Sequence, residues 1–160
     1  MASESFIDED TKFKLTYNIC SALCDLYCLQ PPLAHGHLTP KNIFIQDKES
    51  LKILIGDLGD NSIRKHARIF SGYNYKSVFS CPEILEDALD HSDPNEMFDV
   101  YSFGIIVWEI YSGLVPFNDD YETAFEYVVK NEGRPKIVET IPDTIKEVIR
   151  ECWKHPNRTI

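Results

Sequence analysis

The stretch FDVYSFGIIVWEIYSG, residues 98–113, is the most apolar part of the 160-residue chain and decides its fold. Its apolar side chains fall on all sides of a 3.6-residue period, which is typical of a helix buried in the middle of a domain. We predict this helix over residues 96–112, and Gly113 ends it because glycine adopts left-handed backbone angles easily. The stretch is too short and too interrupted by polar residues to span a bilayer.

Shorter elements are predicted on both sides of this stretch. Upstream, apolar residues recur at helical spacing over residues 11–29, and Pro31 ends that helix. Two short runs rich in β-formers, residues 42–45 and 51–55, indicate a hairpin. The other predicted helices are a short one from Pro82, one over residues 121–130, and one over residues 142–153. The fold class is therefore mainly α with a small β-hairpin.

The composition is that of a globular protein, with 43% hydrophobic and 26% charged residues. A formal net charge of -10 argues against a nucleic acid as partner, because the phosphate backbone is itself an anion. The opening MASESFIDED has neither the basic region nor the apolar core of a signal peptide, and we expect residues 1–10 to be flexible. We expect a cytoplasmic protein without membrane insertion, with a single domain over residues 11–160.

Three of the five cysteines, Cys20, Cys24 and Cys28, follow one another at four-residue spacing and fall in one stripe of the predicted first helix. One interpretation is a soft-metal or redox site, but no CxxC pair or nearby histidine supplies further ligands. The interpretation we favour is that the thiols pack as small hydrophobic side chains on a buried face. By the same argument we expect Cys81 and Cys152 in the core.

The motifs stand in an order that carries a resemblance. After the first predicted helix come HGHLTPKNI, the hairpin, GDLG, SCPE, DVYSFGIIVWE and ECWKHP. This order resembles the C-terminal lobe of a eukaryotic protein kinase domain over residues 11–158, and SFGIIVWEI with ECW resembles the tyrosine-kinase and tyrosine-kinase-like groups. The lobe would be incomplete at both ends relative to the family. No glycine-rich loop or VAIK-type lysine stands ahead of residue 11, and the family adds a last helix after the position of Ile160.

The family's catalytic loop, HRDLKPEN, aligns with HGHLTPKN at residues 35–42. His35 matches a scaffold histidine that packs beneath the metal-binding Asp of the family. His37 replaces the Asp that accepts the proton of the substrate hydroxyl, and Gly36 replaces an Arg that pairs with a phosphorylated activation loop. Thr39 replaces the Lys or Arg that neutralises the transferring phosphate. The resemblance therefore implies a catalytic loop in which His37 is an inactive substitute for the proton acceptor.

The metal motif is closer to the family pattern. Asp57-Leu58-Gly59 resembles DFG, so Asp57 would hold magnesium together with Asn42, which matches the second metal ligand. Phe44 falls where the family places the apolar floor under adenine. The resemblance implies Mg-ATP binding that is weak or absent. The alternative that Asn42 and Asp57 only make hydrogen bonds within their loops stays open.

Further residues match scaffold and regulatory positions of the family. Glu83, in SCPE, matches the Glu of APE and would form an ion pair with a buried Arg, for which Arg158 is the candidate. Asp99 matches the helix carboxylate that braces the backbone of the catalytic loop. The family phosphorylates hydroxyls of the activation loop, and the hydroxyl residues at the corresponding place are Ser71, Tyr73, Tyr75, Ser77 and Ser80.

Two functions follow from the resemblance. In the first, the chain is a catalytically impaired, pseudokinase-like lobe that acts in signalling by binding or scaffolding proteins. In the second, it is a fragment of an ATP-dependent protein kinase that phosphorylates Ser/Thr or Tyr when complete. The replacements at residues 37 and 39 favour the first, since each lost transition-state contact costs about 10²-fold in rate. We expect partners on the apolar face that the family's N-terminal lobe covers, which includes Phe44, Ile45, Leu54 and Leu58.

Overall fold

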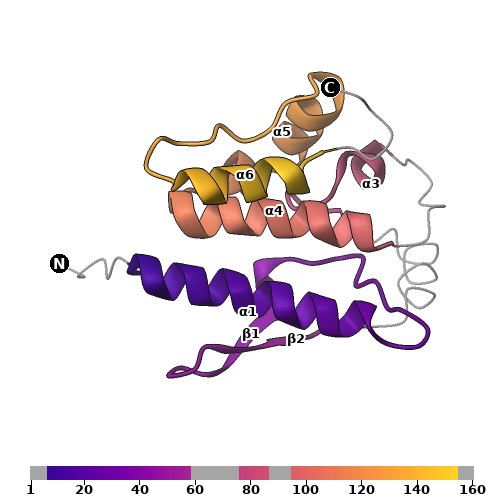
Figure 1. Ribbon diagram of the computed structural model, residues 1–160. Helices are drawn as coiled ribbons and strands as arrows, with labels where there is room; N and C mark the ends of the chain where they lie inside the picture. The colour runs from indigo at the N-terminus through magenta and orange to yellow at the C-terminus, as the bar shows by residue number, and fades with distance from the viewer. Residues whose placement is uncertain (1–6, 59–75, 87–94, 155–160) are drawn as a thin grey trace.

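The structure is a computed structural model that describes residues 7–58, 76–86 and 95–154. Its helices and strands are α1 (Glu9–Tyr27), β1 (Ile43–Asp47), β2 (Lys52–Ile55), α3 (Pro82–Glu86), α4 (Glu96–Ser112), α5 (Tyr121–Phe125) and α6 (Asp143–Cys152). Helix α4 packs against both α1 and α6, and the β1–β2 hairpin packs against α1 (Figure 1). The described part is thus mainly helical with one two-stranded antiparallel sheet, as the sequence predicts.

Helix α4 forms the centre of the core. Eleven of its residues are buried, and Ile105 and Val107 have no exposed surface. The helix begins where the Asn95 side chain accepts a hydrogen bond from the Met97 N–H at 2.9 Å. It ends at Gly113, whose φ of 67° is left-handed. The prediction of a central buried helix over residues 96–112 is therefore confirmed, and so are its two ends.

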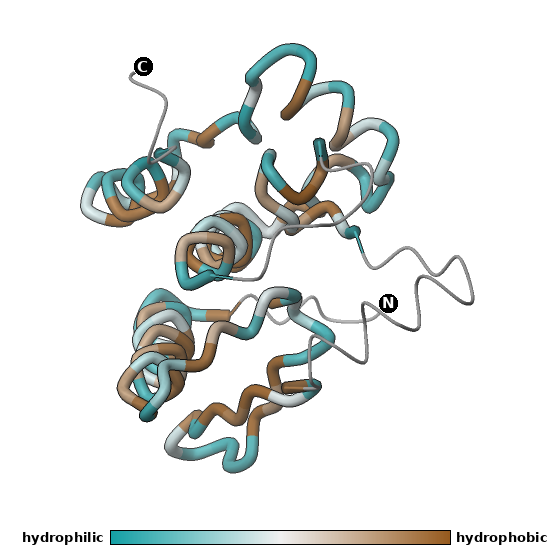
Figure 2. The backbone as a smooth tube through the Cα atoms, turned by 90° about the vertical axis from the view of Figure 1, so that its right-hand side faces the viewer, coloured by the Kyte–Doolittle hydropathy of each residue, from teal (hydrophilic) through white to brown (hydrophobic). Residues whose placement is uncertain are grey.

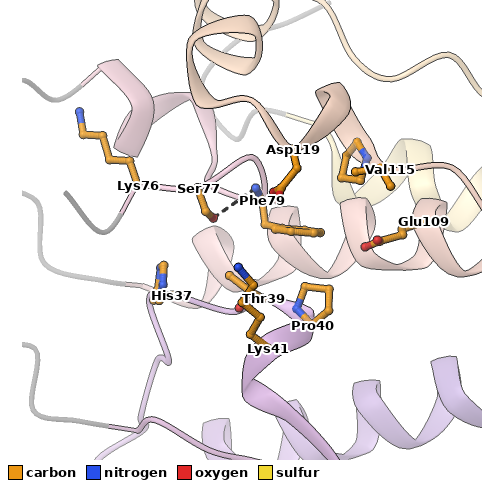
Figure 3. A pocket seen from close by; sticks show the side chains of 11 residues that line it. His37, Thr39, Pro40, Lys41, Lys76, Ser77, Phe79, Glu109, Val115 and Asp119 are labelled. Carbon is orange, nitrogen blue, oxygen red and sulfur yellow. Dashed lines mark hydrogen bonds between the residues drawn. The ribbon is translucent and has the colours of Figure 1, made fainter.

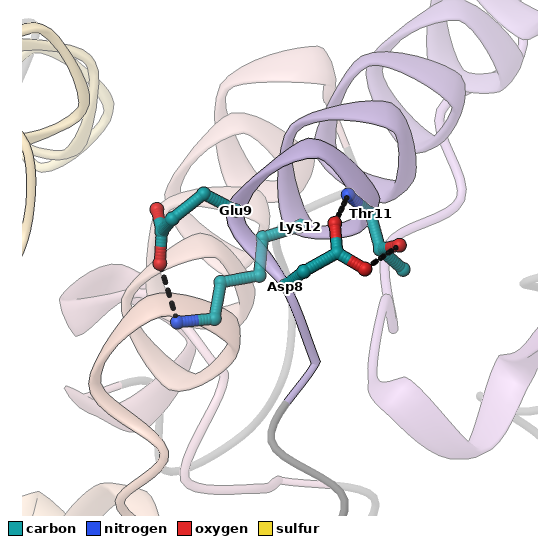
Figure 4. A network of polar contacts seen from close by, with 4 residues as sticks. All are labelled: Asp8, Glu9, Thr11 and Lys12. Atoms are coloured by element: carbon teal, nitrogen blue, oxygen red, sulfur yellow. Dashed lines mark hydrogen bonds and ion pairs between the residues drawn. The ribbon is translucent and has the colours of Figure 1, made fainter.

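Helix α1 begins earlier than the sequence analysis expects. The Asp8 carboxylate accepts hydrogen bonds at 2.9 Å from both the backbone N–H and the hydroxyl of Thr11, which caps the helix (Figure 4). One turn further, the Lys12 ammonium pairs with Glu9 at 2.8 Å. Because this cap fixes the first turn, Glu9 and Asp10 belong to the helix, two residues before the predicted start at residue 11.

The buried face of α1 is not the one predicted. Its buried residues are Thr16, Ile19 and Leu23, while Cys20, Cys24 and Cys28 are exposed. The aromatic residues along the same exposed face, Phe13 and Tyr17, are 57% and 64% exposed. Ile19 and Leu23 belong to the core, and the thiol stripe lies about 100° further round the helix, on the adjacent face. The prediction that these three thiols are buried is wrong.

The other two cysteines follow the prediction more closely. Cys81 is 2% exposed and belongs to the core, and Cys152 is half-buried. Burial raises the pKa of the Cys152 thiol to about 11, so the neutral thiol is its form at neutral pH. Within the described ranges, no group of three or more His, Cys, Asp or Glu side chains is arranged to hold a metal ion.

The hairpin has one face on the core and one face outward. Phe44 pairs with Leu54 across the two strands, and both residues are about half exposed. Ile53, which pairs with Ile45 on the other face, is 7% exposed. The Phe44 ring lies over Gly56, where an added Cβ would come within 2.6 Å of its Cε2 atom. Hydrophobic residues occur on both strands of the hairpin at the bottom of Figure 2. The predicted hairpin is confirmed.

The C-terminal helices close the other side of α4. The predicted helix over residues 121–130 consists of α5 followed by a π-helical turn at Glu126–Lys130. Helix α6 approaches α4 closely at Gly104, where an added Cβ would lie 2.6 Å from the Cβ of Cys152 and 2.9 Å from the Trp153 ring. Among the described residues, no helix is long and apolar enough to cross a membrane.

The contrast between two neighbouring residues of α6 tests this packing. Ile149 has no exposed surface, whereas Val148 is 39% exposed. We expect Ile149→Ala to lower the free energy of unfolding by about 2–5 kcal/mol, because it removes buried methyl groups and leaves a cavity. Val148→Ala should lower it by less than about 1 kcal/mol. Urea unfolding of both variants measures the difference, and equal losses would contradict the packing of α6 on α4.

Candidate functional site

The Asp99 carboxylate holds the loop that carries HGHLTPKN. Asp99 has no exposed surface, and its two oxygens accept the backbone N–H groups of His35 at 2.7 Å and Gly36 at 2.8 Å. The Tyr27 hydroxyl, at the end of α1, donates to the same carboxylate at 3.2 Å. Burial raises the pKa of Asp99, and these hydrogen bonds oppose that shift. The role predicted for Asp99 as a brace agrees with these contacts, whereas the sequence analysis missed Tyr27.

His35 connects this loop to the strand ahead of Asp57. Its side chain is 1% exposed, and its Nδ1 accepts the backbone N–H of His37 at 3.1 Å. The Nε2 atom therefore carries the proton and donates to the Gly56 carbonyl oxygen at 2.9 Å. The Asn42 amide closes the loop by donating to the His37 carbonyl oxygen at 3.0 Å. Backbone groups of residue 37 thus fix the loop, while its side chain takes no part in these bonds.

Asn42 and Asp57, the predicted metal ligands, lie at one end of the hairpin. The Gly56 N–H donates to the Asn42 carbonyl oxygen at 2.8 Å, so the residue before Asp57 is bonded directly to Asn42. Asp57 has a left-handed φ of 57°, and Leu58 after it is 40% exposed. The Asn42 amide nitrogen is used within the loop, which leaves its amide oxygen as an oxygen donor of the kind magnesium prefers. These two residues fit a magnesium ion chemically.

Some predicted residues lie outside the described part or differ from expectation. Gly59, Arg158, Ser71, Tyr73 and Tyr75 are outside the described residues. Ser80 is not on an exposed loop as expected, because it is 9% exposed and its hydroxyl accepts the Ser77 N–H at 3.0 Å. Glu83 lines a small cavity together with Tyr101 and Arg134, and the Arg134 guanidinium lies 5.3 Å from the centre of the Tyr101 ring. The sequence analysis did not consider Arg134.

A pocket of about 420 Å³ opens beside the loop (Figure 3). Four separate parts of the chain line it, and the residues are His37, Thr39, Pro40, Lys41, Lys76, Ser77, Phe79, Glu109, Val115, Pro116 and Asp119. Burial raises the pKa of Glu109, and the negative charge of Asp119 raises it further. The sequence analysis missed both carboxylates, although Glu109 stands in the WE pair of the motif it quotes.

The turn on the far side of the pocket has an unusual backbone. Phe117, Asn118 and Asp119 have φ values of 50°, 55° and 56°, so three consecutive residues other than glycine are left-handed. The Phe117 ring packs near the Tyr127 ring, with 6.1 Å between their centres. Asp119 reaches the pocket from this turn (Figure 3).

Comparison with known proteins identifies the family. A family model described as "Protein tyrosine and serine/threonine kinase" matches residues 2–159. The chain belongs to the protein kinase domain family. The pocket lies beside the loop at residues 35–42, which is the loop that the sequence analysis aligned with the family's catalytic loop.

The relatives of this kinase domain are distant and much longer. A putative serine/threonine-protein kinase/receptor, R826, of Acanthamoeba polyphaga mimivirus is 28% identical over 142 residues, which is 89% of this chain and 8% of the relative. The dual specificity protein kinase pyk3 of Dictyostelium discoideum is 29% identical, with 88% of this chain and 10% of the relative covered. The serine/threonine-protein kinase STY46 of Arabidopsis thaliana is 25% identical, with 91% and 24% covered. This kinase domain therefore spans a small part of the curated relatives it matches.

The hydrogen bond between Tyr27 and Asp99 is open to a direct test. Tyr27→Phe removes one donor from a buried carboxylate, and we expect the free energy of unfolding to fall by about 1–2 kcal/mol at pH 7. The hydrogen bond from Tyr27 lowers the Asp99 pKa. Its removal in the variant therefore raises the Asp99 pKa further above the ordinary value of 3.8. A carboxyl group whose pKa is higher in the folded than in the unfolded protein lowers the free energy of unfolding as the pH increases. The loss caused by Tyr27→Phe should therefore be smaller at pH 4 than at pH 7.

Tyr17→Phe is the matched control, because Tyr17 is on the same helix and 64% exposed. It should leave the free energy of unfolding unchanged at both pH values. Urea unfolding of both variants at pH 4 and pH 7 provides the comparison. If Tyr27→Phe is as neutral as Tyr17→Phe, the hydroxyl does not support the carboxylate.

Proposed function

We propose that this chain is a kinase C-terminal lobe, of the tyrosine-kinase-like type, that transfers no phosphate and acts by binding proteins. The observation that carries the proposal is that the catalytic loop is fully braced while its reactive position holds His37. Asp99, His35 and Asn42 hold the loop by hydrogen bonds that do not use the residue 37 side chain. The frame is therefore preserved independently of the proton acceptor.

Loss of the two transition-state contacts supports the impaired activity. Phosphoryl transfer depends on positioning and on electrostatic stabilisation of the transferring group. His37 replaces the carboxylate that accepts the substrate proton, and Thr39 replaces the cation that neutralises the phosphate. Thr39 is also 6% exposed, so its short side chain cannot reach outward as a lysine would. Two losses of about 10²-fold each leave little of the family's rate.

The proposed function does not depend on binding of magnesium or nucleotide. Asn42 and Asp57 would hold Mg²⁺, which in this family neutralises charge on the nucleotide phosphates when it is bound. Phe44 would lie under the adenine, but it is 55% exposed and packs on Gly56. The family's phosphate clamp of a glycine-rich loop and a VAIK-type lysine is not among these 160 residues. We therefore propose that Mg-ATP binding by this chain is weak or absent.

The outward face of the hairpin supports protein binding. The cross-strand pair Phe44 and Leu54 is 55% and 46% exposed on this face, and the neighbouring residues Ile45 and Leu58 are 49% and 40% exposed. An apolar surface of this kind is typical of an interface. We propose that a protein surface covers it, either another part of the gene product or a separate partner, in a cytoplasmic signalling complex.

A second candidate function is an ATP-dependent protein kinase of which this chain is a part. The printed names of the relatives, serine/threonine-protein kinase and dual specificity protein kinase, favour it. So does Asp57, because a carboxylate at the metal position is a ligand that magnesium prefers. The absence of a carboxylate at residue 37 weighs against this second function. The second function also leaves open whether the substrate residue is Ser/Thr or Tyr.

Two measurements on the 160-residue chain separate these functions. We expect no shift of the melting temperature, or a small one, with millimolar Mg-ATP, because a ligand that binds only the folded state raises that temperature by mass action. We also expect no transfer of labelled γ-phosphate to a mixed peptide library, either by the chain or by its His37→Asp variant. Transfer by the unaltered chain that Asp57→Ala abolishes would overturn the proposal in favour of the kinase.

A further inference from the structure

A small cavity lies between α3, α4 and the end of α6, away from the pocket beside the loop at residues 35–42. Its volume is about 10 Å³, and the residues that line it are Cys81, Pro82, Glu83, Met97, Tyr101, Arg134, Trp153 and Lys154. A water molecule needs about 10–15 Å³, so the cavity has room for a single water molecule and for no larger ligand. Whether water binds there depends on the polar groups of the lining.

Polar side-chain atoms without a hydrogen-bond partner gather around this cavity. Among the described residues, four buried side-chain nitrogen or oxygen atoms lack a partner, and three of the four belong to residues that line it. These three are the Tyr101 hydroxyl oxygen, the Arg134 Nε and the Trp153 Nε1. Tyr101 is 4% exposed and Trp153 is 6% exposed, so bulk water does not reach these atoms. A buried polar atom without a partner costs free energy, which a bound water molecule recovers.

Two backbone carbonyl groups hold the Arg134 guanidinium beside the Tyr101 ring. Its Nη1 donates to the Gly133 oxygen at 2.8 Å, and its Nη2 donates to the Trp153 oxygen at 3.5 Å. The centre of the Tyr101 ring lies 5.3 Å from the Arg134 Cζ atom. Burial raises the pKa of Tyr101, and the positive charge of Arg134 opposes that shift. The Tyr101 hydroxyl and the Arg134 Nε–H therefore belong to the same polar part of the lining.

The donors and acceptors of the lining match those of a water molecule, which donates two hydrogen bonds and accepts two. The Arg134 Nε–H and the Trp153 Nε1–H only donate, whereas the Tyr101 hydroxyl oxygen also accepts. The Glu83 carboxylate adds a second acceptor to the lining. A chloride ion only accepts hydrogen bonds, and the Glu83 carboxylate would repel it. Water therefore fits this lining better than an anion does.

We propose that this cavity binds one structural water molecule, which accepts hydrogen bonds from the Arg134 Nε–H and the Trp153 indole N–H and donates to the Tyr101 hydroxyl oxygen. The second hydrogen of the water is directed to the Glu83 carboxylate. The water joins parts of the chain that are distant in sequence, namely α3 with the SCPE segment, α4 and the end of α6. This site is independent of the phosphotransfer and of the protein binding discussed above.

Nuclear Overhauser transfer from water to the ¹⁵N-labelled 160-residue chain tests the proposal directly. We expect a cross-peak between water and the Trp153 indole N–H, with the sign that a long-lived water molecule produces. The Trp108 indole N–H is the internal control, because Trp108 is 4% exposed and its N–H donates to the Lys136 oxygen at 3.0 Å. It should show no such cross-peak. A missing cross-peak at Trp153, or equal cross-peaks at both indoles, overturns the proposal.

The Tyr101→Phe variant provides a second test, by thermal unfolding. The change removes the oxygen that accepts a hydrogen bond from the water, so we expect the melting temperature to fall by about 2–4 °C. If no water is bound, the change only removes an unpaired buried hydroxyl, and the melting temperature stays the same or increases. Tyr17→Phe is the control, because Tyr17 is 64% exposed, and it should leave the melting temperature unchanged. A melting temperature of Tyr101→Phe at or above that of the unaltered chain contradicts the water site.

A third measurement distinguishes water from chloride as the occupant. The melting temperature of the unaltered chain is compared in sodium chloride and in sodium gluconate, both at about 0.15 M, so that screening of surface charges is equal. We expect equal melting temperatures in the two salts. A higher melting temperature in chloride overturns the water site in favour of an anion site.

Discussion

The rest of the structure depends on one buried carboxylate. Asp99 lies in the first turn of the central helix with no exposed surface, where burying a charge is costly unless hydrogen bonds offset it. The N–H groups of His35 and Gly36 and the Tyr27 hydroxyl supply them. Through these bonds α4, the end of α1 and the loop at residues 35–42 form one unit. The loop lines the pocket and continues into β1, so this unit determines where the pocket and the hairpin lie.

The same bonds show how the conformation of this loop is fixed. The loop is held by backbone N–H groups, by the His35 ring and by the Asn42 amide, and residue 37 enters these hydrogen bonds through its backbone N–H and carbonyl oxygen. Any side chain that fits at residue 37 is therefore compatible with the loop conformation. The residues that hold the loop are therefore separable from the side chain at residue 37.

The sequence predicts the elements well because each depends on a local pattern. Apolar residues on all sides of the helical period predict α4, and the observed caps at Asn95 and Gly113 lie at the predicted ends of that helix. The buried face of α1 could not be predicted, because apolar residues stand on two adjacent faces of that helix, and only contact with α4 and β2 decides which face is buried. The pocket was missed for a similar reason. Its carboxylates, Glu109 and Asp119, come from segments distant from the loop, and no spacing in the sequence relates them to Thr39 or Lys41.

The left-handed turn at Phe117–Asp119 has a consequence for how this domain can vary. A left-handed conformation costs about 1–2 kcal/mol for a residue other than glycine, so glycine at Phe117 would relieve the backbone. The same change would delete the ring that packs near Tyr127. An unstrained backbone and the packing of the Phe117 ring therefore place opposite demands on this single residue. Homologous domains should resolve that competition in one of two ways, keeping an aromatic residue with the strain or accepting a glycine together with a smaller residue at the position of Tyr127.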